Sequence, residues 1–233
     1  MQIIIGIGVI LLAYFIGSIP FGWLIVKLKT GQDIRVIESG RTGGTNAMRA
    51  AGLWVGLLTV LMDILKGATA VWIARALIPD AHLLHVLAPI AAIIGHNYSI
   101  FVPVRNEQGR IVRLRGGAGG APAVGGAFGL WGPSILIIVP LGALVFFTLG
   151  IASVTTMSVA FFAIIIFAIR AWLGFSPWTY VLYGILAELL LIWALRPNLK
   201  KLFTGKERIV KQSLHGWVKA KRDTQQPNHG NAS

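Results

Sequence analysis

Long apolar runs constrain the fold of this chain more than any other feature of its sequence. The first run covers residues 3–26 and so has 24 residues, and a transmembrane helix needs about 20. Hydrophobic residues fill 55% of the 233 positions and charged residues only 12%, too few to cover a soluble domain of this size. The sequence therefore predicts an all-α fold, a polytopic bundle of transmembrane helices.

We expect about seven membrane-spanning helices, which form a single transmembrane domain over residues 1–203. A Gly-Ser-Ile-Pro-Phe-Gly stretch at residues 17–22 predicts a kink in the first helix. The fourth and fifth helices are short against a hydrocarbon core of about 30 Å, and we interpret them as two short, sheltered helices in preference to a re-entrant hairpin. The expected spans cover residues 3–26, 53–74, 83–102, 117–131, 134–149, 154–171 and 178–195.

The distribution of basic residues predicts the orientation of the bundle. With the N-terminus outside and the C-terminus cytoplasmic, 18 of the 21 Lys and Arg fall on the cytoplasmic side, where basic loops are favoured. They lie in a motif loop at 27–51, a second motif loop at 103–120, and the segment from Arg196 onward. We expect residues 204–233 to form a basic cytoplasmic tail that is disordered beyond Thr224. This topology explains the net charge of +13 without a nucleic-acid partner.

Two glycine-rich segments in these loops are suited to bind anions. Residues 39–49 read Ser-Gly-Arg-Thr-Gly-Gly-Thr-Asn-Ala-Met-Arg, and residues 113–122 read Arg-Leu-Arg-Gly-Gly-Ala-Gly-Gly-Ala-Pro. Small residues let backbone N–H groups approach a phosphate, and Thr45 or Asn46 can cap a helix whose N-terminus favours an anion. The alternatives are a flexible loop with topology-setting arginines for the first segment and tight helix packing for the second. For Gly125 and Gly126 we expect packing.

Few ionisable residues fall inside the predicted spans. Asp63 and Lys66 are three positions apart on one helical face, so they can pair, either in a polar site or as a structural ion pair. His96 is a candidate acid-base group, although an isolated histidine in a helix more often has a packing role. His82 and His85 lack a third ligand nearby, so we expect no metal site, and the absence of cysteine excludes disulfides and thiolate ligands.

These segments together resemble the bacterial acyl-phosphate:glycerol-3-phosphate acyltransferases, small seven-span membrane enzymes of phospholipid synthesis. The resemblance covers nearly the whole chain. Residues 63–67, 95–96 and 196–207 match family motifs in place. The first family motif reads Ser-Gly-Asn-x-Gly-Ala-Thr-Asn-x-x-Arg, and it is matched at Ser39, Gly40, Gly43, Thr45, Asn46 and Arg49.

The chain also departs from the family pattern. The second family motif, Lys-Gly-Gly-Lys-Gly, becomes Arg-Gly-Gly-Ala-Gly at residues 115–119, so that Ala118 replaces the second lysine. Arg41 stands where the family has asparagine, and Leu195 where the tail motif has histidine. Arginines at 41, 113 and 115 can restore positive charge, but a displaced guanidinium is not equivalent to a lysine.

The resemblance implies an enzyme that moves a fatty acyl group from acyl phosphate to the 1-hydroxyl of glycerol 3-phosphate and gives lysophosphatidic acid, with no cofactor and no metal. The implied partners are these two substrates and membrane lipid. The implied location is the bacterial inner (plasma) membrane, multi-pass, with the active face cytoplasmic. The implied phosphate ligands are Arg49, Arg115 and the backbone of Gly116, Gly117 and Gly119. The implied catalytic residues are Ser39, Thr45, Asn46, His96 and Asn198.

Two other functions stay open from the sequence. The altered positions 118 and 195 allow a catalytically silent paralogue that binds a lipid or phospho-ligand on the same membrane scaffold. The pair of charges at 63 and 66 also allows a small transporter, although the chain has no clear internal repeat of the kind common in transporters.

Overall fold

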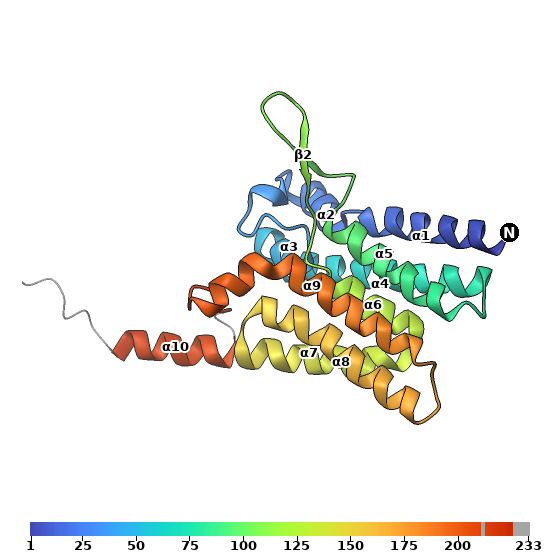
Figure 1. Ribbon diagram of the computed structural model, residues 1–233. Coiled ribbons are helices and arrows are strands. Elements are labelled where there is room, and N and C mark those ends of the chain that lie inside the picture. The colour runs from blue at the N-terminus through green and yellow to red at the C-terminus, as the bar shows by residue number, and fades with distance from the viewer. Residues whose placement is uncertain (211–212, 226–233) are drawn as a thin grey trace, which may run out of the picture.

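The computed structural model describes residues 1–210 and 213–225, which form a helical bundle with one small β-hairpin (Figure 1). This confirms the predicted membrane helix bundle. The helices of the bundle are α1 (Gln2–Ser18), α4 (Leu53–Leu77), α5 (His82–Asn97), α6 (Gly120–Leu130), α7 (Ile135–Leu149), α8 (Ala152–Trp172) and α9 (Thr179–Phe203). The smaller elements are α2 (Phe21–Thr30), η1 (Ile34–Val36), α3 (Gly44–Ala51), β1 (Pro103–Arg105), β2 (Ile111–Leu114), η2 (Gly132–Ser134) and α10 (Leu214–Gln225).

Among the described residues, five helical segments are long and apolar enough to cross a membrane. They are Gln2–Thr30, Leu53–Leu77, Gly132–Leu149, Ala152–Trp172 and Thr179–Phe203, whereas α5 is a shorter apolar helix. The count of seven crossings and the sides on which the termini lie stay predictions. Apart from Gln225, which ends α10, the predicted disorder of the tail falls on residues outside the described part of the chain.

The pair of short helices differs in part from its prediction. Helix α6 has 11 residues, hence a length of about 16 Å, and most of it is buried among its neighbours, as expected of a sheltered helix. Helix α7 is not sheltered, because only Ile138 and Gly142 are buried in it and large apolar side chains such as Leu136 and Phe147 are exposed. An apolar exposed face of this kind suits contact with lipid.

The predicted kink in the first span is a complete break between α1 and α2, at Ile19 and Pro20. The break frees main-chain carbonyl groups that must find donors inside the bundle. Lys66 Nζ donates to the Ile19 carbonyl at 3.0 Å, and Ser99 Oγ donates to the Ser18 carbonyl at 2.6 Å. The buried lysine of α4 therefore stabilises the break in the neighbouring segment.

Helix α9 continues past its predicted end at residue 195 and reaches Phe203, although Pro197 lies within it. A proline lacks the N–H that would bond the carbonyl four residues earlier, which here belongs to Trp193. Arg196 supplies the missing donor, because its Nε lies 2.9 Å from the Trp193 carbonyl oxygen, and its guanidinium stacks on the Trp193 ring. The extended helix carries Asn198 and Lys201 beyond the apolar part of the bundle.

Glycines allow α4 and α6 to pack at very short range. A Cβ atom on Gly125 would collide with the backbone of Ile64, and one on Gly126 would collide with the Tyr183 hydroxyl. Tyr183 in turn donates to the Ala123 carbonyl at 2.5 Å. The predicted packing role of both glycines is confirmed.

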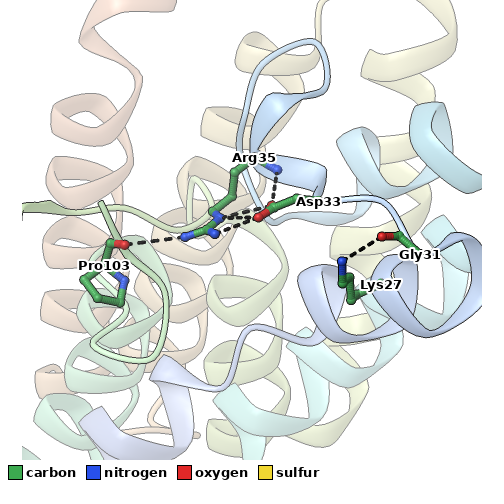
Figure 2. Close-up of polar contacts among 5 residues, drawn as sticks. All are labelled: Lys27, Gly31, Asp33, Arg35 and Pro103. Carbon is green, nitrogen blue, oxygen red and sulfur yellow. Dashed lines mark hydrogen bonds and ion pairs between the residues drawn. The ribbon is translucent and has the colours of Figure 1, made fainter. Parts of the chain in front are cut away.

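The second basic loop contains an antiparallel hairpin that the sequence did not reveal, and Figure 1 shows it projecting from the bundle beside α2. Arg35 ties its base to the first basic loop, as Figure 2 shows, because its Nη1 donates to the Pro103 carbonyl at 3.4 Å. The same guanidinium donates to both carboxylate oxygens of Asp33, at 2.6 and 3.0 Å. This hydrogen bonding holds the pKa of Asp33 at about 2.

Candidate functional site

A cavity of about 230 Å³ lies at one end of the bundle. Six parts of the chain enclose it: residues 38–49 with the start of α3, residues 60 and 63 of α4, residue 96 of α5, residues 118–121 at the start of α6, residues 152–156 at the start of α8, and the end of α9 with residues 207 and 208. Segments far apart in the sequence therefore meet at one polar opening.

The first turns of three helices lie in the lining of this cavity. Helices α3, α6 and α8 begin at Gly44, Gly120 and Ala152, which all line it, and none of the three has a side-chain cap. The first N–H groups of a helix have no partner within it and carry a partial positive charge. Gly119, which precedes α6, has a φ of 91°, a left-handed conformation that favours glycine. The backbone alone thus favours an anion here.

Cationic side chains from separate segments add to this field. Arg41, Arg49, Lys201 and Arg208 all line the cavity. Arg208 forms an ion pair with Glu38, which is on the cavity wall too. The other three make no ion pair with any described residue. Their positive charge is available to an anionic ligand.

Arg41 is held across the cavity wall by three oxygen atoms. Its Nη1 donates to the Gly117 carbonyl at 3.0 Å, and its Nη2 donates to the Ala194 carbonyl at 2.7 Å and to Asn198 Oδ1 at 3.4 Å. Burial lowers the pKa of Arg41 below its usual value, and the nearby charge of Arg115 lowers it further. Arg41 therefore joins three parts of the chain: the first basic loop, in which it lies, the glycine loop at residues 116–119, and α9.

The inner wall contains a buried network of charged and polar groups. Lys66 Nζ lies 2.8 Å from Asp63 Oδ1 and 2.9 Å from His96 Nδ1, and all three side chains are almost fully buried. Asp63 and His96 also line the cavity. The predicted pairing of Asp63 with Lys66 is confirmed. His96 Nδ1 also lies 3.5 Å from Asp63 Oδ1, so this ring nitrogen faces both charged partners.

A second set of hydrogen-bonded polar side chains joins α8 to the end of α9. Ser153 Oγ donates to Glu207 Oε1 at 3.1 Å, and Asn198 Nδ2 donates to the same oxygen at 2.9 Å. The remaining carboxylate oxygen of Glu207 can orient a hydroxyl donor in the cavity.

Seven of the ten predicted site residues line this one cavity. They are Ser39, Thr45, Asn46, Arg49, His96, Gly119 and Asn198. Their individual roles stay predictions. For Asn46 the contacts favour a positioning role, because its buried amide donates to the carbonyls of Ile34, Ile37 and Arg41 at 2.9 to 3.2 Å and so shapes the loop.

Three predicted phosphate ligands, Arg115, Gly116 and Gly117, lie outside the lining, and their role in phosphate binding stays a prediction. Arg115 turns back to the first loop, where its Nη2 donates to the Ser39 carbonyl at 2.6 Å. The Gly117 N–H is already bonded to the His96 carbonyl at 2.9 Å, and a Cβ atom there would collide with the His96 ring. Gly116 packs against the same carbonyl. These glycines fix the loop on α5.

Several cavity residues had no predicted role. Lys201 follows Asn198 by three positions and shares its helical face, but the sequence predicted only a basic segment there and no helix. Ser153 and Glu207 are brought together only by tertiary packing. Arg41 departs from the family motif and is one of three arginines predicted to be able to restore positive charge, but it was not among the predicted site residues. In the described part of the chain no cluster of three or more His, Cys, Asp or Glu is arranged to hold a metal ion.

Comparisons with known proteins point to one family. The family model described as glycerol-3-phosphate acyltransferase matches residues 7–205. The chain is 34% identical over 204 residues to the glycerol-3-phosphate acyltransferase of Syntrophomonas wolfei subsp. wolfei, covering 86% of this chain and 94% of that one. It is 36% identical over 199 residues to the enzyme of the same name from Thermus thermophilus, covering 85% and 92%.

The fold is similar to crystal structures of PlsY, an integral membrane glycerol 3-phosphate acyltransferase. The glycerol 3-phosphate form matches with a TM-score of 0.75 and 29% identity, covering 88% of this chain and 95% of that one. The lysophosphatidic acid form matches with a TM-score of 0.74 and 27% identity, covering 91% and 98%. Sequence and fold agree that this chain belongs to the glycerol-3-phosphate acyltransferase family.

Proposed function

We propose that this chain transfers a fatty acyl group from acyl phosphate to the 1-hydroxyl of glycerol 3-phosphate and releases lysophosphatidic acid and phosphate. The observation that carries the proposal is the convergence of three uncapped helix N-termini with Arg41, Arg49 and Lys201 on one cavity. Both substrates are phosphates, so such a cavity can bind both. The names of the relatives, and the glycerol 3-phosphate and lysophosphatidic acid forms of PlsY, support this choice of substrate and product.

The reaction itself requires little from the protein beyond positioning. Acyl phosphate is a mixed anhydride, so the hydroxyl oxygen of glycerol 3-phosphate attacks the acyl carbon and the bond from that carbon to the phosphate oxygen breaks. The departing phosphate takes up the hydroxyl proton, and no covalent enzyme intermediate is needed. Holding the two reactants together and stabilising charge on the carbonyl oxygen supply the rate enhancement.

We assign separate roles to the lining residues. Arg49 and Lys201 are the proposed phosphate ligands, together with the first-turn amides that follow Gly119. Ser39, Thr45 and Asn198 are the proposed partners of the glycerol hydroxyls. His96 and Asn46 hold the wall and the loop, through the contacts described above. Apolar residues on the same lining, such as Val60, Ala121 and Leu195, suit the first carbons of the acyl chain.

We place this active face on the cytoplasmic side of a bacterial inner membrane. The basic loops at 27–51 and 103–120 and the end of α9 lie at the same end of the bundle as the cavity. Basic loops are retained on the cytoplasmic side. The acyl chain would then lie among apolar helices while both phosphates stay at the aqueous rim.

Adjacent lysines of α9 give a matched test of the proposal. Lys201 lines the cavity and Lys200 does not, and both are exposed lysines in the same turn. We expect Lys201→Ala to lower kcat/KM about 10- to 100-fold, because a hydrogen bond to a charged group contributes about 1.5–3 kcal/mol. Lys200→Ala should leave it within about twofold.

The assay uses purified protein in lipid vesicles, with acyl phosphate and glycerol 3-phosphate supplied and lysophosphatidic acid measured. Lysophosphatidic acid formation that falls in Arg49→Ala and Lys201→Ala supports the proposal. Binding of glycerol 3-phosphate without product would favour the silent paralogue, for which the uncharged Ala118 in the lining is the supporting observation. Equal product with wild-type protein and with empty vesicles would remove the enzyme proposal.

A further inference from the structure

We propose that Arg41 binds a substrate phosphate directly and supplies, from the first loop, the positive charge that the glycine loop lacks at Ala118. This inference rests on the proposed function for the identity of the phosphate ligand. It assigns the residue that sets phosphate affinity in this chain, and it explains how the chain tolerates a small uncharged residue in the cavity wall.

The hydrogen-bond inventory of Arg41 leaves donors for a ligand. A guanidinium has five N–H groups, and three of them are engaged by the Gly117 and Ala194 carbonyls and by Asn198 Oδ1. The Nε–H and one Nη1–H have no partner among the described residues. A phosphate that lies in the cavity lining beside Arg41 can accept a hydrogen bond from one of these free N–H groups.

Arg41 makes no ion pair with a described carboxylate, and this separates it from other arginines of the same region; Glu207 acts on it only at a distance, through a shared bond to Asn198. Arg35 has the carboxylate of Asp33, as Figure 2 shows, and Arg208 has that of Glu38. The oxygens that hold Arg41 belong to two carbonyls and an amide, which are neutral. A largely buried guanidinium with neutral partners is stabilised when an anion enters.

The position of Arg41 relative to Ala118 gives the inference its specific form. The guanidinium bonds the carbonyl of Gly117, the residue directly before Ala118, and both Arg41 and Ala118 line the cavity. Arg115 does not substitute for a cation there, because it bonds the Ser39 carbonyl and lies outside the lining. A cation on residue 41 and a cation on residue 118 would therefore serve the same part of the cavity.

A charge relocation experiment tests this. The variants are Arg41→Asn, Ala118→Lys, the double variant Arg41→Asn/Ala118→Lys, and the control Arg113→Asn, which removes an exposed arginine outside the lining. The measurements are the KM for each substrate, the inhibition constant of inorganic phosphate, and the melting temperature. We expect Arg41→Asn to raise the inhibition constant of phosphate about tenfold or more, the double variant to recover most of that loss, and Arg113→Asn to change it less than about twofold.

A different outcome is expected if Arg41 only joins three segments of the chain and binds no phosphate. Arg41→Asn would then lower the melting temperature, leave the inhibition constant of phosphate unchanged in the folded fraction, and gain nothing from Ala118→Lys. That result overturns the inference. If the wild-type protein has no turnover, the proposed function fails, but phosphate binding measured by ³¹P NMR with the same four variants still decides the role of Arg41. Equal binding by wild type and Arg41→Asn refutes that role. Weaker binding by Arg41→Asn that returns in the double variant supports it.

Discussion

Asp63 and Lys66 form an ion pair deep inside the bundle, and the substitution Asp63→Asn breaks it while keeping the size of the side chain. The two groups are 2.8 Å apart and each is at most 3% exposed. Removal of one partner from a buried pair costs about 3–5 kcal/mol, because the other charge stays buried without compensation. Lys66 keeps the Ile19 carbonyl and the His96 ring as neutral partners, so we expect the lower end, about 3 kcal/mol.

The assay is reversible unfolding in mixed micelles, with the free energy of unfolding compared between variants. Asp80→Asn is the matched control, because Asp80 is exposed in the turn before α5; its cost should be below about 0.5 kcal/mol. The double variant Asp63→Asn/Lys66→Met removes both charges and should cost only about 1–2 kcal/mol, less than Asp63→Asn alone. If Asp63→Asn and Asp80→Asn unfold with equal free energies, or if the double variant is the least stable, the ion pair does not stabilise the bundle as argued.

Three further predictions follow from the packing and the loops. Gly125→Ala should destabilise the bundle by about 1–3 kcal/mol, whereas Gly8→Ala, where an added methyl meets open space, should be neutral; unfolding measurements compare them. Asn46→Asp sets a carboxylate against three carbonyl oxygens and should abolish activity while the helix content measured by circular dichroism is kept. Arg35 holds the pKa of Asp33 at about 2, below the usual 3.8, so the pair stabilises the hairpin base at neutral pH and loses this effect as pH falls from about 4 toward 2; the protection factors for hydrogen exchange in residues 103–114, taken relative to the intrinsic rate at each pH, should fall over that range, and protection factors independent of pH would refute the anchor.

Hydropathy and local spacing were sufficient to predict the parts of the fold that depend on short stretches of chain. The membrane helices follow from uninterrupted apolar runs, and the break at Ile19 and Pro20 follows from a proline between glycines. The pairing of Asp63 with Lys66 follows from their separation of three residues on a helix. In each case the determining interactions lie within one or two turns.

The side-chain directions in the loops could not be predicted, because tertiary contacts decide them. Arg41 and Arg115 both stand beside glycines in basic loops, yet Arg41 bonds the carbonyls of Gly117 and Ala194 in the cavity wall while Arg115 bonds the Ser39 carbonyl of the first basic loop. Lys201 was missed for a related reason. The last predicted span ended at residue 195, but α9 continues through Pro197, where the Arg196 side chain bonds the main chain.

The most direct test of the account is an experimental structure of this protein with glycerol 3-phosphate bound. The account predicts density for the phosphate inside the cavity, within hydrogen-bonding distance of Arg41 and of either Arg49 or Lys201, and close to the first turn of α3, α6 or α8. A phosphate bound instead at Arg115 outside the cavity, or at the hairpin with the cavity empty, would contradict it.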